Sequence, residues 1–135
     1  MVLCIVDATG IQDYIFGSNR LQENLGASFL VAQATGSWVK ECLPRPHNLT
    51  PDGQVDPDRR LEADEKQKSE LLYSGGGNAV VLLRDDSPAR AFAGALSRKV
   101  LSEAPGLELA IYFEEVEFAE LNATVMSRVQ EGLAA

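Results

Sequence analysis

The sequence predicts one α+β domain with the ferredoxin-like order β-α-β-β-α-β and one extra helix at its C-terminal end. The chain has 135 residues, of which 45% are hydrophobic, enough for a single domain with its own core. Short apolar runs of strand type alternate with longer segments in which apolar residues recur at helical spacing. We expect a largely antiparallel sheet with helices on one face.

The N-terminal part predicts one strand and two helices. Residues 2–7 (VLCIVD) form the apolar run of a central strand, and the turn at 8–10 leads into a short helix over 11–16. Gly-Ser-Asn at 17–19 ends that helix. A second helix is expected from about 25 to 43, because one face of it collects Leu30, Val31, Ala34, Trp38 and Cys42.

The C-terminal part predicts a hairpin, a helix, a strand and a last helix. The strand-like residues 70–73 and 79–83 flank the glycine-rich turn SGGGN at 74–78. Ser87 and Pro88 predict the N-cap and first residue of a helix that runs to about residue 103. A fourth strand is predicted over 107–113, and the extra helix over about 119–132.

Residues 44–69 form a polar insertion within this single domain of residues 1–135. They include four of the six prolines and many charges, and they show no apolar periodicity. We interpret the insertion as a flexible excursion that is too polar to pack, with a helix near 61–68 as an alternative. His47, the one histidine of the chain, lies here and is expected to be solvated.

The net charge and the shortness of the apolar runs exclude some classes of function. The formal net charge is −8, so a broad basic face for nucleic acid is not expected, although a local nucleotide pocket stays open. No apolar stretch approaches the ~20 residues of a membrane span, and we expect no signal peptide from the first residues, which lack a basic segment. We expect a cytoplasmic protein without membrane association, in which Cys4 and Cys42 are reduced structural thiols.

Asp7 is the leading candidate for a functional carboxylate. In the predicted topology the first strand and the hairpin are neighbours, so Asp7 should lie close to the turn at 75–78. A carboxylate beside a turn without side chains can hold a divalent cation and admit phosphates. Alternatively, Asp7 caps the following helix and the glycines serve only positive φ angles. Three glycines, where a two-residue hairpin needs one or two, favour close approach by a ligand or partner.

Other polar clusters have weaker interpretations. Glu114, Glu115 and Glu117 are typical of a solvated edge, and Asp85 with Asp86 fits a helix N-terminus. Ser28 follows Gly26 at the expected start of the second helix, where it either caps that helix or contacts an anion.

Three blocks of the sequence resemble the palm domains of the CRISPR polymerase family, the large subunit of type III CRISPR effector complexes. DATGIQDYIF at 7–16 resembles the opening D-x-[ST]-G-I-Q-x-[FY]-I-[FY] of those palms. LGASFL at 25–30 is similar to their helix start G-x-S-[FY]-L, and YSGGGN at 73–78 to their hairpin Y-[AS]-G-G-G-N. The three blocks occur in the family's order along most of the chain.

The resemblance implies a palm related to GGDEF nucleotide cyclases. The family's active palm carries a GGDD hairpin, whose acidic residues hold two metal ions while ATP is joined into cyclic oligoadenylates. In this chain Gly77 and Asn78 stand at those two positions, and Asp7 alone matches a metal carboxylate. The resemblance is therefore to the first palm, which lacks GGDD, is not catalytic alone and packs against the catalytic palm.

This resemblance implies a degenerate palm of an antiviral CRISPR system that supports ATP binding together with a second, catalytic palm. Asp7 would be the Mg²⁺ or Mn²⁺ contact, and the partner would be the second palm, other subunits of the effector complex, or a second copy of the chain. The residues implied for nucleotide binding are Ser28, Ser74, Gly75, Gly76, Gly77 and Asn78.

Two alternatives remain open at the level of sequence. One is a purely structural assembly module without nucleotide binding, marked by an exposed apolar face. The other is an active, self-pairing cyclase in which Glu114 or Glu115 joins Asp7 as a substitute metal ligand.

Overall fold

The computed structural model describes residues 1–17 and 20–117 of the chain. Four strands form one sheet in the order β2-β3-β1-β4, and every neighbouring pair is antiparallel. The strands are β1 (Val2–Thr9), β2 (Ser69–Gly75), β3 (Asn78–Leu83) and β4 (Glu108–Glu115). This order confirms the α+β, ferredoxin-like fold. The helix expected over 119–132 lies outside the described residues.

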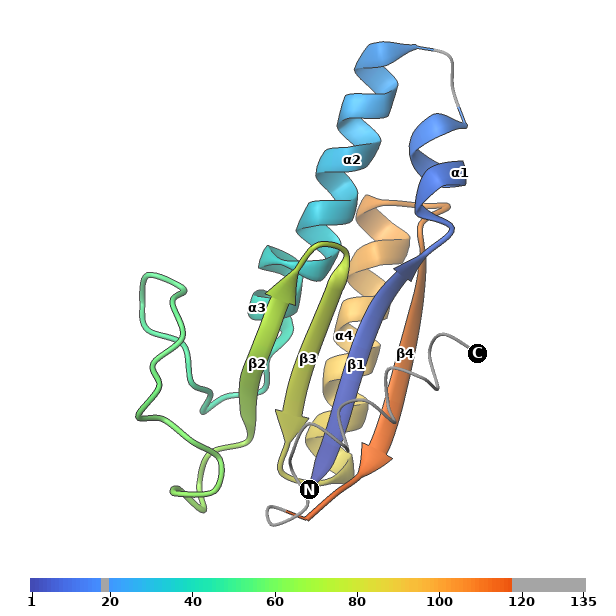
Figure 1. Cartoon of the computed structure of the whole chain (residues 1–135). Coiled ribbons are helices and arrows are strands. Elements are labelled where there is room, and N and C mark those ends of the chain that lie inside the picture. Colours follow the sequence, from blue (N-terminus) through green and yellow to red (C-terminus); the bar gives the residue numbers. More distant parts are fainter. Residues whose placement is uncertain (18–19, 118–135) are drawn as a thin grey trace.

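Helices cover one face of the sheet (Figure 1). They are α1 (Ile11–Phe16), α2 (Leu21–Thr35), α3 (Ser37–Cys42) and α4 (Asp86–Glu103). The short helix α1 matches its predicted bounds. No helix in the described part of the chain has the length and apolar character needed to cross a bilayer.

Both faces of the central strand β1 are buried, which explains its unbroken apolar run. Val2, Cys4 and Val6 face the helices, where they join the cluster that contains Phe92 and Leu96 of α4. The residues between them, Leu3 and Ile5, belong to a second cluster on the opposite face, with Leu61, Val80, Leu82 and Val116. The sheet therefore has packed side chains on each side of β1.

The predicted helix over 25–43 is wrong in its bounds. The structure has α2, which begins four residues earlier than expected, and the separate helix α3. Gly36 separates them, with its backbone in neither helical nor strand conformation. A Cβ atom at Gly36 would lie 2.8 Å from the carbonyl oxygen of Ala32, so the chain turns here in a way that only glycine tolerates.

The N-cap of α4 also differs from the prediction. Asp85, not Ser87, is the capping residue, and its carboxylate accepts a hydrogen bond from the backbone N–H of Ser87 at 3.2 Å. Pro88 consequently lies two positions deeper in the helix than expected, still within the first turn, where its missing N–H costs no hydrogen bond.

The polar insertion of residues 44–69, hereafter the excursion, packs against the domain, contrary to the prediction that it is too polar to do so. It consists of turns and bends, and the alternative of a helix near 61–68 is not formed. Leu61 is fully buried, and Asn48 and Gln67 are each 2% exposed. These buried positions are isolated in the sequence, so no periodic pattern marked them.

Arg84, just after β3, hydrogen-bonds the C-terminal part of the excursion. Its guanidinium donates to the backbone carbonyls of Leu61, Asp64 and Gln67 at 2.6, 2.5 and 3.1 Å. One side chain therefore satisfies three acceptors in a segment that has no regular secondary structure to pair them.

Candidate functional site

Asp7 lies directly opposite Asn78 in the antiparallel pairing of β1 with β3. Side chains at such opposed positions share a face of the sheet, with Cβ atoms about 4.5–5.5 Å apart. Because Asp7 alternates with Leu3 and Ile5, this pair lies on the face away from the helices. The predicted proximity of Asp7 to the glycine hairpin is therefore confirmed.

Gly76 and Gly77 form the two-residue loop of that hairpin, between the paired residues Gly75 and Asn78. Their φ angles of 61° and 88° are both positive, as in a type I′ turn, and Gly75 has a φ of 145°. The Gly77 carbonyl accepts a hydrogen bond from the Ala8 N–H at 2.9 Å. Backbone conformation alone thus accounts for all three glycines, so their number is not by itself a sign of a ligand.

Asp7 does not cap the helix that follows it, which removes one of the alternatives for this residue. The N-cap position of α1 is Gly10, in left-handed conformation, and no side chain hydrogen-bonds the end of the helix there. Among the residues that the structure describes, no cationic side chain forms an ion pair with Asp7. Partial burial raises the pKa of the Asp7 carboxyl group.

The residues at this corner fit one hydrated divalent ion, not a pair of ions. The described part of the chain contains no group of three or more His, Cys, Asp or Glu side chains placed to hold a metal. Of the two opposed residues, Asp7 supplies a carboxylate and Asn78 an amide oxygen as possible ligands on this face. A Mg²⁺ ion held by one carboxylate keeps most of its water ligands.

Ser74 lies on the other face of the sheet from Asp7. It pairs with Ala79, which faces the helices and is buried among them. Ser28 lies within α2, on the helix side, and is exposed. Because α2 begins at Leu21, Ser28 is not at a helix start, and its N–H is not one of the free amides of a helix N-terminus.

The site residues predicted from sequence are therefore divided between two faces. Asp7 and Asn78 lie on one, Ser28 and Ser74 on the other, and Gly76 is exposed at the tip between them. A ligand that touched both groups would have to lie across the tip of the hairpin.

Tyr73 is a site residue that sequence reasoning missed as an individual position. A β-bulge at Leu72 turns Tyr73 onto the face of Asp7, where it pairs with Val80 and is 54% exposed. Its hydroxyl oxygen lies 3.8 Å from the positions that a Cβ atom would take on Gly75 and Gly76. Strict alternation from Leu71 would have placed Tyr73 on the helix side, so nothing in the sequence pattern marks the bulge.

Glu114 and Glu115 cannot share a metal ion with Asp7 within one chain. Glu114 pairs with Leu3, four positions along β1 from Asp7, which corresponds to about 13 Å. Glu115 pairs with Val2, on the other face, and β4 ends there, at the end of the sheet opposite to the hairpin (Figure 1). Within one chain these carboxylates therefore do not meet at Asp7, and the self-pairing cyclase stays a prediction that would need a second copy to bring them together.

A pocket of about 340 Å³ opens at the hairpin end of β1. Thr9 and Glu108, which pair across β1 and β4, line it together with Gly10, Tyr14, Pro105 and Gly106. Thr9 is two positions from Asp7 and shares its face. The carboxylate and this pocket therefore lie at the same end of the sheet.

The fold and this corner define a palm-type α+β domain with one carboxylate opposite a glycine hairpin. The crystal structure of the apo Csm1–Csm4 cassette contains a similar region, in Csm1, with a TM-score of 0.61 and 19% sequence identity. The same cassette in complex with pppApApA matches with a TM-score of 0.58 and 17% identity.

These two likenesses cover 98% of this chain and 18% of the Csm1 chain, so the chain spans less than a fifth of that protein's length. At such identity they establish the fold. No protein-family model matches the sequence, and no curated protein matches it.

Proposed function

We propose that this chain is a degenerate palm of the type III CRISPR large-subunit class, which supports ATP binding beside a second, catalytic palm in cyclic oligoadenylate synthesis. The observation that carries the proposal is Asp7 opposite Asn78 at the glycine hairpin. The three sequence blocks that resemble CRISPR palms and the fold shared with part of Csm1 support it.

The geometry supports a role in binding more than in catalysis. Phosphoryl transfer with two metal ions requires several carboxylates to hold the ions and offset the developing charge. This corner offers one carboxylate, and the resemblance to CRISPR palms implies that Gly77 and Asn78 stand where the active palm has its two acidic residues. We therefore assign the chemical step to the second palm.

Each residue at the corner has a specific role in this proposal. Gly76 is exposed at the tip of the hairpin and carries no side chain, so phosphates can approach its backbone, while the buried Gly77 shapes the turn. Asn78 donates a hydrogen bond to the nucleotide or to the partner palm. Asp7 contacts one hydrated Mg²⁺ or Mn²⁺ ion, while the hydroxyl groups of Ser28 and Ser74 contact a phosphate from the helix side.

Titration calorimetry of ATP into the chain, with and without Mg²⁺ or Mn²⁺, tests the proposal. We expect saturable binding that needs the metal and that the Asp7→Ala substitution weakens by about ten-fold. Glu115→Ala is the matched control, because it removes the same charge at the far end of the sheet. Absence of metal-dependent binding at millimolar ATP, or an equal loss in both variants, would contradict the proposal.

One further observation favours the purely structural alternative. Leu21, Leu25 and Phe29 follow one another at intervals of four along α2, and they are 71, 63 and 60% exposed. A row of exposed apolar side chains on a helix is typical of a surface that packs against a partner. If this row is the chain's working surface, Leu25→Glu will abolish association with other type III effector subunits, and ATP will not bind the unmodified chain.

A further inference from the structure

A cationic pocket of about 530 Å³ lies beside the outer edge of β2, between the end of α3 and the excursion. Such a volume is in the range of about 300–1,000 Å³ that small-molecule sites occupy. The residues that matter for its chemistry are Lys40, Arg45, His47, Leu49, Pro51 and Arg59. Arg45 and Arg59 come from opposite parts of the excursion, so its fold brings these charges together.

The cations of this pocket are largely unneutralised, although the chain has a net charge of −8. Lys40 donates to the carbonyl oxygen of Gly53 at 2.8 Å, and no ion pair joins Lys40 or Arg45 to a carboxylate among the described residues. Arg59 reaches Asp56 only at 3.6 Å.

The carboxylate that lines the pocket, that of Glu41, forms an ion pair with a cation outside the pocket. Glu41 lies 3.7 Å from Lys99 of α4. Three positive side chains therefore face the pocket against one carboxylate that already has a partner. Placing like charges together costs free energy, which a bound anion would recover.

His47 adds a neutral hydrogen-bond donor to the same wall. Its Nδ1 accepts a hydrogen bond from the N–H of Leu49 at 3.1 Å, so the neutral ring carries its proton on Nε2. Burial, followed by the charges of Arg45 and Arg59, lowers the pKa of the imidazole. At neutral pH His47 therefore donates through Nε2 without charge of its own.

A second hollow, of about 480 Å³, lies on the other side of His47 and Arg59. Asp58 and Asp64 line it together with Arg60, so its charges nearly balance. An anion should therefore bind in the first pocket and not in the second. Leu49 and Pro51 give the first pocket an apolar wall beside its cations.

We propose that the pocket between α3 and the excursion binds a small phosphate ester. The phosphate group lies among Arg45, Lys40 and the Nε2 of His47, and the organic part of the ligand rests against Leu49 and Pro51. This site is separate from the corner at Asp7, because β3 and the width of β2 lie between Asp7 and Asn48, which joins this part of the excursion to the edge strand. It does not depend on the proposed function.

Nuclear magnetic resonance provides a direct test, because the chain contains one histidine. The pKa of His47 is measured in chloride, in inorganic phosphate and in AMP at matched ionic strength, with adenosine as the ligand without phosphate. We expect phosphate and AMP to raise the pKa of His47 by about 1, as an adjacent anion does. AMP should act at lower concentration than phosphate, because it also covers the apolar wall.

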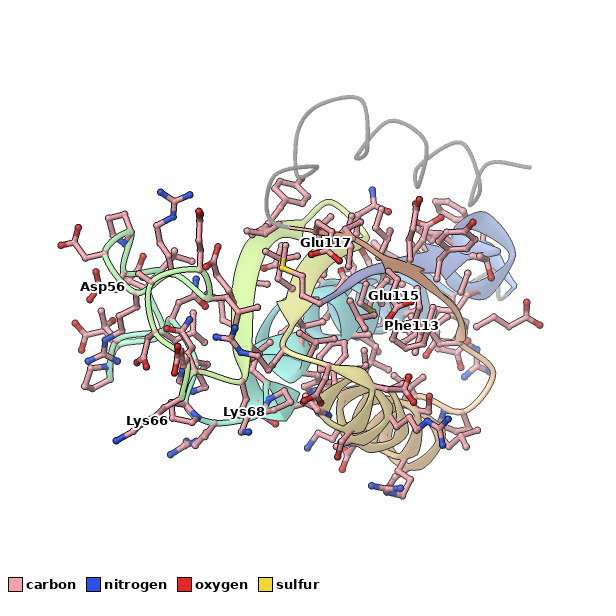
Figure 2. All side chains as sticks on the ribbon, turned by 90° about the horizontal axis from the view of Figure 1, so that it is seen from below. Asp56, Lys66, Lys68, Phe113, Glu115 and Glu117 are labelled. Atoms are coloured by element: carbon pink, nitrogen blue, oxygen red, sulfur yellow. The ribbon has the colours of Figure 1, made fainter. Side chains whose placement is uncertain are left out.

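Two variants test whether the change in the pKa of His47 arises from binding in this pocket. Arg45→Ala changes an exposed side chain, so the fold should be retained, and we expect it to weaken phosphate binding by about ten-fold. Lys66→Ala is the matched control, because Lys66 belongs to the excursion (Figure 2) but does not line the pocket. Asp7→Ala should leave the response of His47 unchanged, which separates this site from the proposed ATP corner.

Three results would overturn the proposal. The first is a His47 pKa that is the same in phosphate as in chloride, since no anion would then be bound beside the ring. The second is an equal effect of adenosine and AMP, which would show that the phosphate group is not recognised. The third is an unaltered response in Arg45→Ala.

Discussion

The side-chain amide of Asn48 takes the place of a neighbouring strand at Leu71. Its Oδ1 accepts a hydrogen bond from the Leu71 N–H at 2.7 Å, and its Nδ2 donates to the Leu71 carbonyl oxygen at 2.9 Å. β2 is an edge strand, so these backbone groups would otherwise lack partners beneath the excursion. One asparagine thus joins the excursion to the sheet.

Replacing Asn48 by alanine should destabilise the chain strongly. The substitution leaves a buried N–H and a buried carbonyl without partners, a loss of about 2–4 kcal/mol at the usual cost of each group. Urea unfolding measures the change. Gln22→Ala removes an exposed amide from α2 and is the control, for which we expect no significant change. Equal stability of the two variants would show that the Asn48 bonds do not hold the excursion.

Arg84→Lys tests the anchoring of the other end of the excursion. Lysine keeps the charge but cannot reach the carbonyls of Leu61, Asp64 and Gln67 with a planar fork of donors. We expect a loss of about 1–3 kcal/mol and faster amide hydrogen exchange over residues 59–68. Arg90→Lys, at an exposed ion pair with Asp86, should change neither measurement.

Three glycines, two in the hairpin and one in α2, should differ in their tolerance of alanine. Gly76→Ala meets only the cost of a positive φ, about 1–2 kcal/mol. Gly77→Ala adds a contact of 3.1 Å with Cδ1 of Ile11, so it should be the more destabilising variant. Gly26→Ala lies in open space within α2 and should stabilise the chain by about 0.5–1 kcal/mol. Thermal unfolding of the three variants measures this order.

Asp7→Asn should raise stability at neutral pH. Burial places the folded-state pKa of Asp7 above its unfolded value, so the stability gained from the protonated form is lost as the pH rises through the folded-state pKa. The asparagine variant lacks this loss, and its melting temperature should exceed that of the parent chain by on the order of 2 °C at neutral pH. The difference should vanish at a pH below the ordinary pKa of aspartate. A constant difference across this range would contradict the argument.

The two thiols should react in different states of the protein. Burial raises the pKa of Cys4 to about 12, so it carries almost no thiolate in the folded chain. Burial and the charge of Glu41 also raise the pKa of Cys42, but that residue is only half-buried. A thiol reagent should therefore modify Cys42 slowly in the native chain and Cys4 only after unfolding. Rapid native reaction of a Cys42→Ser variant would contradict this assignment.

The sequence was sufficient where several neighbouring residues carried the same signal. The apolar run of β1, the glycine hairpin and the helical spacing in α4 predicted those elements and their order. The position of Asp7 opposite Asn78 followed from that order, because the first strand and the hairpin are neighbours in such a sheet.

The sequence was insufficient where one residue decided the structure. Gly36 divides a continuous apolar stripe into two helices, and Arg20, at the N-cap of α2, has no capping side chain to mark the start. The bulge at Leu72 moves Tyr73 to the face of Asp7. Asn48 and Arg84 act through bonds to backbone atoms far along the chain, which no local pattern encodes.

The central place of β1 has a consequence for how the chain is made. Within this domain the strand is synthesised before both of its partners, residues 78–83 and 108–115. A ribosome must therefore release most of the domain before β1 can be paired on both sides, and its apolar residues stay available to chaperones during that time. Truncation before Glu108 would leave β1 as an open edge, so an incomplete chain of this protein should aggregate instead of folding in part.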